Sequence, residues 1–288
     1  MTRRRLDAEL VRRGLVSSRE QGRAAIEGGR VSISGVTATK AATQVDDAAA
    51  IELVAEPGSD FVSRGAHKLI GALDAFGLDV RDANALDAGA STGGFTQVLL
   101  QRGARHVIAV DVGYGQLAWL LRSDDRVIVL ERTNVRHLDA SRDELPYPPD
   151  LVVADLSFIS LTAVLPALVT VAAPTANLVL MVKPQFEVGK ERVGSGVVTS
   201  PDLRREAVAR VVTAAEAEKL AIFGVAASPL PGPKGNVEYF LWMGKVGGDA
   251  AEPSEHDGAM EREDRVSAGL SAGEIESAIA RAVLEGPQ

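Results

Sequence analysis

Four ionisable side chains stand where strands and helices of an alternating chain would bring them together. Lys68 lies near the start of a predicted helix, Asp155 and Lys183 end two apolar strands, and Glu238 opens a third strand. A charged residue at the end of an apolar strand is costly unless it is paired or functional. A lysine held between two carboxylates can orient a weak nucleophile such as a ribose hydroxyl and take or relay its proton. For any one of the four residues alone, a structural ion pair explains the charge better.

Metal binding, disulfide formation and methylation of nucleic-acid bases fit this chain less well than a reaction at a ribose hydroxyl. There is no cysteine, which excludes a thiolate metal site, a disulfide framework and the nucleophile of cytosine carbon-5 methylation. Many enzymes that methylate amino groups carry D/N-P-P-Y/F after the fourth strand, whereas this chain has Asp155-Leu156-Ser157-Phe158. The four histidines are scattered and form no metal-ligand motif. We therefore expect no metal.

A glycine-rich loop joins the first core strand to the helix that follows it. Its glycines allow a sharp turn and close approach of a ligand, which in open α/β sheets lies at the carboxyl ends of the strands. Ser91 replaces the second glycine of a dinucleotide loop, so a cofactor without pyrophosphate, S-adenosylmethionine, fits better. A plain tight turn is the alternative. The expected cofactor-binding residues of this segment are Asp87, Gly89, Ala90, Ser91, Thr92, Gly93, Gly94 and Phe95.

The next strands supply further candidates for the cofactor. Asp111 ends the second strand, 22 positions after Gly89, where an acid can accept hydrogen bonds from both hydroxyls of a ribose. Thr133 and Asn134 follow the third strand, and we expect them to flank the adenine.

Residues 63–244 alternate strands with helices, which predicts a mostly parallel, doubly wound α/β sheet. Only a turn rich in proline and glycine separates the last two strands, which predicts a terminal antiparallel pair. The expected helices are Ala66–Phe76, Gly94–Gln101, Gly115–Leu121, one in the 160s, and Leu203–Leu220. The expected strands are Ala85–Ala88, His106–Asp111, Val127–Glu131, Leu151–Asp155, Asn177–Lys183, Ile222–Ser228 and Val237–Met243.

Residues 1–58 are predicted to form a separate small α+β domain, with two short helices before residue 30 and two strands after it. The whole chain has a net charge of −8, but residues 1–30 hold eight arginines against four acids, a local charge of +4. This charge predicts contacts to RNA phosphates, and a solvated helix face is the alternative. The expected contact residues are Arg3, Arg4, Arg19 and Arg23, with Arg64 added from the second domain.

The remaining segments complete the predicted organisation. Residues 59–62 are expected to link the domains, 245–268 to be a flexible acidic segment, and 269–288 to hold a last helix that starts with the capping box Ser271–Glu274. Residues 156–182 carry no charge and are long enough to span a bilayer, but Pro166 and Pro174 interrupt them. We interpret this segment as loop, buried helix, turn and buried strand, and expect no membrane span.

At these residues the sequence closely resembles the TlyA (hemolysin A) family, actinobacterial type. The matching segments are VSRGAHKL, LDAGASTGGFT, DVGYGQLAW, LERTN, DLVVADLSFISL, VKPQFEVGK and SPLPGPKGNVEYFLW. The resemblance covers nearly the whole chain and implies a Rossmann-like class I methyltransferase sheet of the FtsJ-like group. It also implies that the N-terminal domain has the RNA-binding fold named after a small-subunit ribosomal protein.

The resemblance implies a function as well. The family's Lys-Asp-Lys-Glu tetrad falls on the four residues named first, and its members methylate the 2′-oxygen of cytidines in 16S and 23S rRNA, within 30S and 50S subunits. Their loss gives resistance to capreomycin-type antibiotics. We accordingly expect a monomeric cytoplasmic enzyme. A membrane-active hemolysin and a non-catalytic rRNA-binding assembly factor are the alternatives.

The linker departs from the family pattern. Relatives carry Arg-x-Trp-Val, whereas this chain has Ser59-Asp60-Phe61-Val62, so an aromatic residue and a valine remain and the arginine is absent. The acidic stretch before the last helix resembles an insertion.

Overall fold

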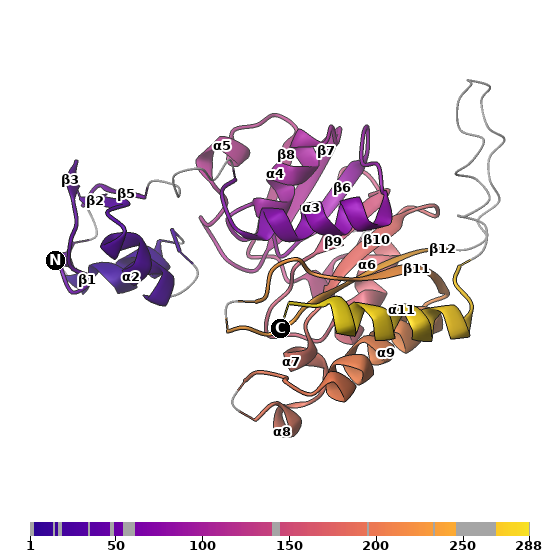
Figure 1. Cartoon of the computed structure of the whole chain (residues 1–288). Coiled ribbons are helices and arrows are strands. Elements are labelled where there is room, and N and C mark those ends of the chain that lie inside the picture. The colour runs from indigo at the N-terminus through magenta and orange to yellow at the C-terminus, as the bar shows by residue number, and fades with distance from the viewer. Residues whose placement is uncertain are drawn as a thin grey trace.

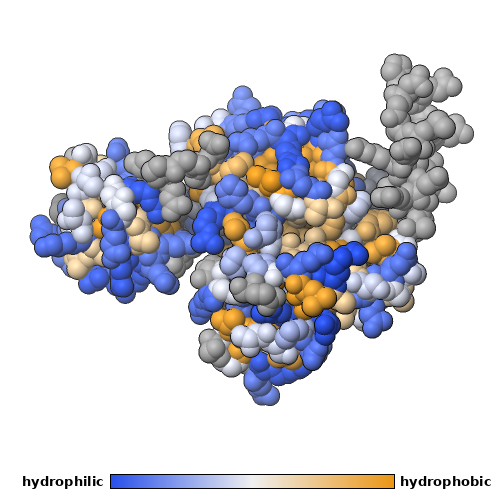
Figure 2. All heavy atoms as spheres, in the orientation of Figure 1, coloured by the Kyte–Doolittle hydropathy of each residue, from blue (hydrophilic) through white to orange (hydrophobic). Residues whose placement is uncertain are grey.

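The structure, a computed structural model, has a small N-terminal part and a larger part built around one sheet (Figure 1). The visible face is mostly hydrophilic and is broken by smaller hydrophobic areas (Figure 2). The residues that the structure describes are 3–13, 15–16, 19–33, 35–46, 49–53, 61–139, 145–194, 196–232, 234–245 and 269–287.

The larger part contains a seven-stranded sheet with the order β11-β12-β10-β9-β6-β7-β8. Strands β6 to β10 run parallel to one another, and β12 lies antiparallel between β10 and β11. The predicted doubly wound sheet and its terminal antiparallel pair are thus confirmed. The strands are β6 Asn84–Ala88, β7 His106–Asp111, β8 Val127–Glu131, β9 Leu151–Ala154, β10 Asn177–Val182, β11 Leu220–Ala227 and β12 Tyr239–Lys245.

Helices cover both faces of this sheet, because successive strand residues point to opposite sides. Leu86 of β6 belongs to the apolar cluster on one face, and its neighbour Ala85 belongs to the cluster on the other. On the Ala85 face lie α3 Gly65–Phe76, α4 Gly94–Gln101 and α5 Trp119–Arg122. On the Leu86 face lie η1 Val135–His137, η3 Leu161–Ala163, α6 Leu165–Val171, α9 Pro201–Ala217 and α11 Ala272–Glu285. Two short helices, α7 Pro184–Glu187 and α8 Lys190–Val193, follow β10.

The uncharged segment 156–182 folds as the sequence predicts, into a loop, the helices η3 and α6, a turn and β10. Leu165 and Leu168 of α6 are fully buried, and Leu180 of β10 lies in the middle of the sheet. Within the described ranges, no helix is long and apolar enough to cross a membrane.

Several element boundaries differ from the prediction by two or more residues; β11, for example, starts at Leu220 and not at Ile222. The helix expected over 115–121 is shorter, because Gly115 adopts a left-handed φ of 68° and Ala118 is extended. Helix α9 starts earlier, at Pro201, because the Ser200 side chain accepts a hydrogen bond from the backbone N–H of Leu203. Strand β12 starts at Tyr239, two residues later than expected, which leaves Glu238 just outside the sheet.

The N-terminal part has a core of its own. Leu6 and Leu10 of α1 pack with Ile26 of α2 and Val31 of β2, all of them buried. The two predicted helices are present, and each of the two predicted strand regions contains a strand. The elements are β1 Arg4–Arg5, α1 Leu6–Arg12, α2 Arg19–Glu27, β2 Val31–Ile33, β3 Val36–Thr37, β4 Gln44–Val45 and β5 Ile51–Leu53.

The predicted capping box of the last helix is confirmed. The Ser271 side chain caps α11, and the Glu274 carboxylate accepts the backbone N–H of Ser271 at 2.9 Å. Just before it, Leu270 donates its N–H to Ile222 O of β11 at 2.8 Å. Residues 246–268 of the expected acidic segment and residues 59–60 of the expected linker lie outside the described residues.

Candidate active site at the carboxyl edge of the sheet

The sheet register brings two of the four candidate residues to neighbouring positions. Val182 of β10 pairs with Tyr239 of β12, so the next positions outward along the two antiparallel strands are Lys183 and Glu238. Asp155 directly follows β9, which is parallel to β10 and adjacent to it. Parallel strands end at one edge of a sheet, so all three residues meet at the carboxyl edge.

Two lysine–carboxylate ion pairs form at this edge. Lys68 Nζ of α3 lies 2.5 Å from Glu238 Oε2, and Lys183 Nζ lies 2.5 Å from Asp155 Oδ1. The Lys68–Glu238 pair is almost fully buried, whereas the Asp155 side chain is 24% exposed. A buried pair costs desolvation energy for both ions, so the Lys68–Glu238 pair is weak evidence for a gain in stability.

The two pairs are connected through the first turn of α3. A Cβ on Gly65, the first residue of α3, would lie 3.9 Å from Asp155 Oδ2, and Lys68 follows within one turn. The carboxylate thus lies near the positive end of the helix dipole. The structure therefore brings all four predicted residues to one site, although Glu238 reaches it from a loop and not from a strand.

The sequence analysis missed Ser157 at this site. Its Oγ accepts a hydrogen bond from Lys183 Nζ at 3.0 Å, so the ammonium of Lys183 contacts both Ser157 and Asp155. The available signal was the segment Asp155–Phe158, where two short polar side chains follow an apolar strand.

The glycine-rich loop lies directly beside these ion pairs. Asp155 N donates to Ala88 O at 3.1 Å, and a Cβ on Gly89 would lie 2.8 Å from the carbonyl oxygen of Asp155. Gly89 and Gly93 have φ values of 87° and 98°, in the left-handed region that favours glycine. A Cβ on Gly93 would also collide with the side chain of Leu121 of α5. A side chain at either position would strain the backbone and displace neighbouring atoms.

Asp111 closes the other side of the loop. Its carboxylate accepts the backbone N–H of Ser91 at 2.8 Å and that of Gly113 at 2.7 Å, one on each oxygen. A carboxylate offers about four lone-pair positions, so each oxygen retains one acceptor position. Two acceptor positions on one partly exposed carboxylate suit a pair of neighbouring hydroxyls, as a ribose presents.

Asp87 is a fully buried acid at the end of β6. Thr96 of α4 donates its hydroxyl to Asp87 Oδ2 at 2.7 Å, whereas Asp87 Oδ1 has no hydrogen-bond partner in the part of the chain that the structure describes. Burial raises the pKa of Asp87 to about 7, and the hydrogen bond from Thr96 opposes this rise. An ionised carboxylate of this kind is stabilised by a cationic group that reaches it.

Comparison with known proteins places this site in a family. Residues 61–245 match the family profile described as FtsJ-like methyltransferase. The chain belongs to the FtsJ-like methyltransferase family. Residues 4–51 match the S4 domain. The fold expected from the sequence, a methyltransferase sheet preceded by a small domain of this type, is therefore confirmed.

Relatives of this methyltransferase include characterised and solved proteins. The chain is 54% identical to the 16S/23S rRNA (cytidine-2′-O)-methyltransferase TlyA of Mycobacterium tuberculosis over 99% of both chains. It is 36% identical to Hemolysin A of Brachyspira hyodysenteriae, over 82% of this chain and 97% of that protein. The solved structure of a Streptococcus thermophilus protein named as a hemolysin matches with a TM-score of 0.71 and 34% identity, over 99% of this chain and 97% of the other.

The cofactor of this FtsJ-like methyltransferase is S-adenosylmethionine. The site residues fit its chemistry. The unpartnered oxygen of Asp87 suits a cationic amino group, and the acceptor positions of Asp111 suit ribose hydroxyls.

We predict that replacing Asp87 with asparagine changes the pH dependence of stability of the cofactor-free methyltransferase. The pKa of Asp87 is raised from 3.8 to about 7 on folding, so the folded state retains a proton that the unfolded state releases. In the wild type, the protonated Asp87 carboxyl therefore contributes fully to the free energy of unfolding below pH 3.8. This contribution is lost as the pH rises to about 7, by about 1.4 kcal/mol per pH unit.

The amide of the Asp87→Asn variant does not ionise, and its oxygen can still accept the hydroxyl of Thr96. The melting temperature of the variant relative to wild type should rise between pH 4 and pH 7 and then level off. A constant difference between the melting temperatures of the variant and the wild type from pH 4 to pH 7 would contradict the prediction. The same variant should bind S-adenosylmethionine more weakly, as measured by calorimetry.

Thr133 and Asn134 follow β8, and the N–H of Thr133 donates to Asp111 O at 3.0 Å. Asn134 uses its side-chain oxygen to accept the N–H of Arg136, and the Thr133 hydroxyl donates to Glu131 O. Both therefore have local partners, and their expected contact with the adenine stays a prediction. In the described ranges, no three metal-ligating side chains gather at one place.

Proposed function

We propose that this methyltransferase transfers a methyl group from S-adenosylmethionine to the ribose 2′-hydroxyl of cytidine in ribosomal RNA. The observation that carries the proposal is the pair of lysine–carboxylate contacts beside the glycine-rich loop. Such groups suit a hydroxyl nucleophile, which must be oriented and must lose its proton. The name of the M. tuberculosis relative, which is 54% identical over the whole chain, supports the choice of cytidine in 16S and 23S rRNA.

In this proposal Lys183 is the group that contacts the nucleophile. The Lys183 ammonium first passes a proton to Asp155, the carboxylate with which it pairs. The neutral amine that results orients the hydroxyl and accepts its proton as the oxygen attacks. Lys68 and Glu238 complete the constellation, and the buried Glu238 Oε1, which has no hydrogen-bond partner among the described residues, is a further acceptor at the site.

The bound cofactor supplies an electrophilic methyl group, so an oxygen–carbon bond forms as the sulfur–carbon bond breaks. What this chain adds is alignment of the attacking oxygen, which accounts for much of the rate of an in-line displacement. The carboxylates of Asp87 and Asp111 hold one reactant, and Lys183 holds the other. The proposed cofactor contacts are Asp87, Gly89, Ala90, Ser91, Thr92, Gly93, Gly94, Phe95, Asp111, Thr133 and Asn134.

We further propose that the S4 domain docks the enzyme on rRNA within 30S and 50S subunits, as a monomer in the cytoplasm. Arg3, Arg23 and Arg64 are exposed, which suits contact with phosphates. Arg4 and Arg19 are the other two proposed contacts, and both are ion-paired with acids of the same domain.

The decisive experiment is transfer of tritiated methyl groups to 30S and 50S subunits from a strain that lacks this protein. We expect label in the rRNA of both subunits. Since a 2′-O-methyl group blocks alkaline cleavage of the adjacent phosphodiester, the label should be recovered in alkali-resistant dinucleotides that begin with cytidine. Label released as mononucleotides would contradict ribose methylation, and label in one subunit alone would contradict the double specificity.

Two relatives named as hemolysins raise a second candidate function, action on membranes. The segment that would have to insert, 156–182, contributes β10 to the middle of the sheet and the buried helix α6 to its core. Insertion would require the sheet to come apart. Leakage from liposomes with native protein, absent with a heat-denatured sample, would favour this candidate over the one that we propose.

A further inference from the structure

The N-terminal part contains two fully buried carboxylates, Asp7 and Glu9 of α1. Both are surrounded by arginines. Asp7 accepts two hydrogen bonds from Arg5, at 3.0 and 3.1 Å, and a third at 2.9 Å from Arg19 of α2. A buried carboxylate needs a cation, and here it also joins side chains from two helices and the strand before them.

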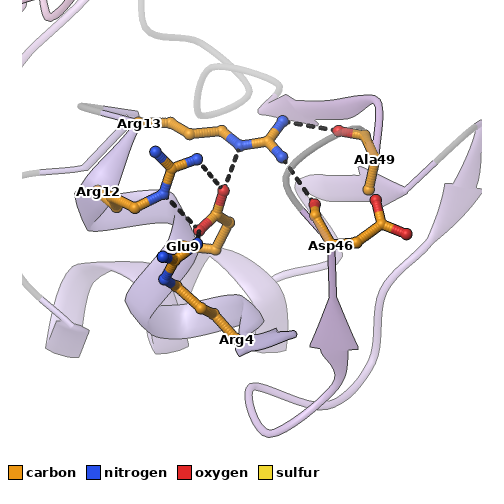
Figure 3. Close-up of polar contacts among 6 residues, drawn as sticks. All are labelled: Arg4, Glu9, Arg12, Arg13, Asp46 and Ala49. Carbon is orange, nitrogen blue, oxygen red and sulfur yellow. Dashed lines mark hydrogen bonds and ion pairs between the residues drawn. The ribbon is translucent and has the colours of Figure 1, made fainter. Parts of the chain in front are cut away.

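Glu9 has the same arrangement with different arginines (Figure 3). Its carboxylate receives two hydrogen bonds from Arg12, at 2.5 and 2.7 Å, and one from Arg13 at 2.8 Å. Arg4 Nη1 lies 4.0 Å away. The fork of a guanidinium matches a carboxylate, so Arg5 on Asp7 and Arg12 on Glu9 are each fixed by two parallel bonds.

Arg13 has a structural role that the others lack. Its guanidinium also donates to Ala49 O at 2.6 Å and to Asp46 O at 3.1 Å, so it ties α1 to the segment between β4 and β5 (Figure 3). Its side chain is only 21% exposed. Arg5, Arg12 and Arg19 are 42%, 46% and 56% exposed, and we call these three side chains the arginine surface.

The number of arginines exceeds what the two acids require. Two cations would neutralise Asp7 and Glu9, whereas five guanidiniums lie within 4.0 Å of these two carboxylates. Like charges held near one another repel, and a polyanion relieves this repulsion. Neutralisation of buried acids alone therefore does not explain the cluster.

We propose that Asp7 and Glu9 are positioning residues, which hold the arginine surface in a fixed geometry that binds the phosphate backbone of RNA. The inference rests on the proposed function, in which this domain docks on rRNA. It differs from the sequence prediction, which chose Arg3, Arg4, Arg19 and Arg23, because Arg5 and Arg12 are now included and two acids are given a role in RNA binding. Fixed guanidiniums lose less side-chain entropy when a phosphate binds.

The two acids keep their charge at neutral pH. The hydrogen bonds from Arg5 hold the pKa of Asp7 at about 2, and those from Arg12 hold the pKa of Glu9 at about 2, in both cases against the effect of burial. The clusters thus have one fixed charge state under the conditions in which RNA binds.

The test is the substitution Asp7→Asn in the full chain, with affinity for 16S rRNA transcribed in vitro measured by filter binding over a range of salt concentrations. Removing a negative charge should strengthen binding to a polyanion if charge alone matters. If Asp7 positions Arg5 and Arg19, affinity should fall about tenfold despite the added positive charge, and the salt slope should decrease by about one to two. Equal or tighter binding would overturn the proposal.

Asp82→Asn is the matched control. Asp82 is an exposed acid of the second domain that pairs with Arg105 at 3.8 Å, and its left-handed φ of 59° accommodates asparagine. It produces the same change in charge and chemistry, and it should leave affinity unchanged or slightly higher. This binding assay needs no methyl transfer, so loss of RNA affinity and absence of ribose methylation are separate results.

Asp7 also accepts the N–H of Ala8, so Asp7→Asn could destabilise α1. The double variant Arg5→Lys, Arg19→Lys therefore provides a second test, because it keeps Asp7 and every charge but removes the planar forks. We expect affinity to fall about tenfold here as well, in a variant whose circular dichroism spectrum shows that it is folded. Wild-type affinity in this variant would show that only point charges matter and would overturn the proposal.

Discussion

Replacing Lys183 with alanine should reduce methyl transfer by a factor of about 10² to 10⁴ while leaving affinity for S-adenosylmethionine within a factor of about two. The reduction follows from the position of Nζ, which is 2.5 Å from Asp155 Oδ1 and 3.0 Å from Ser157 Oγ. Without the amine, the hydroxyl nucleophile loses the group that orients it and the path by which its proton leaves. Transfer from tritiated cofactor to ribosomal subunits gives the rate, and calorimetry gives the affinity.

Lys245→Ala is the matched control. Lys245 ends β12 at the opposite edge of the sheet, is partly buried, and donates to Ala172 O at 2.7 Å. Its removal costs a hydrogen bond and local packing, as the removal of Lys183 does, but it should leave the rate of transfer near that of wild type. If the Lys183→Ala variant transferred methyl groups at the wild-type rate, the catalytic role assigned to Lys183 would be wrong. Absence of methyl transfer by the wild-type protein would favour a non-catalytic assembly factor.

The location of this site was predictable from the sequence because the strands are apolar and their ends are charged. Asp155 and Lys183 each interrupt a run of aliphatic residues, and burial of such runs forces the chain to place the charge at an edge. Strand–helix alternation then implies parallel strands, whose carboxyl ends share that edge. Two local patterns therefore determine a feature of the whole fold.

The pairing within the site was not predictable. It depends on β12 lying between β10 and β11, so that Lys183 and Glu238 become opposite positions. No local pattern encodes the register of strands that lie far apart along the chain. Glu238 also lies outside the strand expected for it, because Asn236 uses its side-chain oxygen to accept the N–H of Val198 and holds the chain in a loop.

In the N-terminal domain, too, the sequence predicted one feature and left another to the packing of the fold. A local charge of +4 was visible in the sequence, but Asp7 and Glu9 counted there only as charges that reduce it. Their burial results from the packing of α1 against α2, which also brings Arg19 to Asp7 across 12 residues of chain. Side-chain orientation in the fold, and not composition, separates an acid that weakens a basic surface from one that positions it.

Replacing Gly89 with alanine should raise the dissociation constant for S-adenosylmethionine by at least about tenfold. Two costs combine at this position. The φ of 87° is unfavourable for any residue with a Cβ, by about 1–2 kcal/mol, and the new Cβ would lie 2.8 Å from the backbone oxygen of Asp155. A backbone atom cannot rotate away as a side chain can, so the loop must shift from β9, and both the cofactor contacts and the position of Asp155 should change with it.

Gly77→Ala separates these costs. Gly77 ends α3 with a φ of 61°, but nothing lies within 4 Å of its added Cβ. This variant should lose about 1 kcal/mol of stability and keep its affinity for the cofactor. If calorimetry gave Gly89→Ala the affinity of wild type, the loop would be a plain tight turn with room to spare, and the cofactor would have to bind elsewhere on the edge. The comparison therefore tests whether the close approach of β6 and β9 is what shapes the cofactor site.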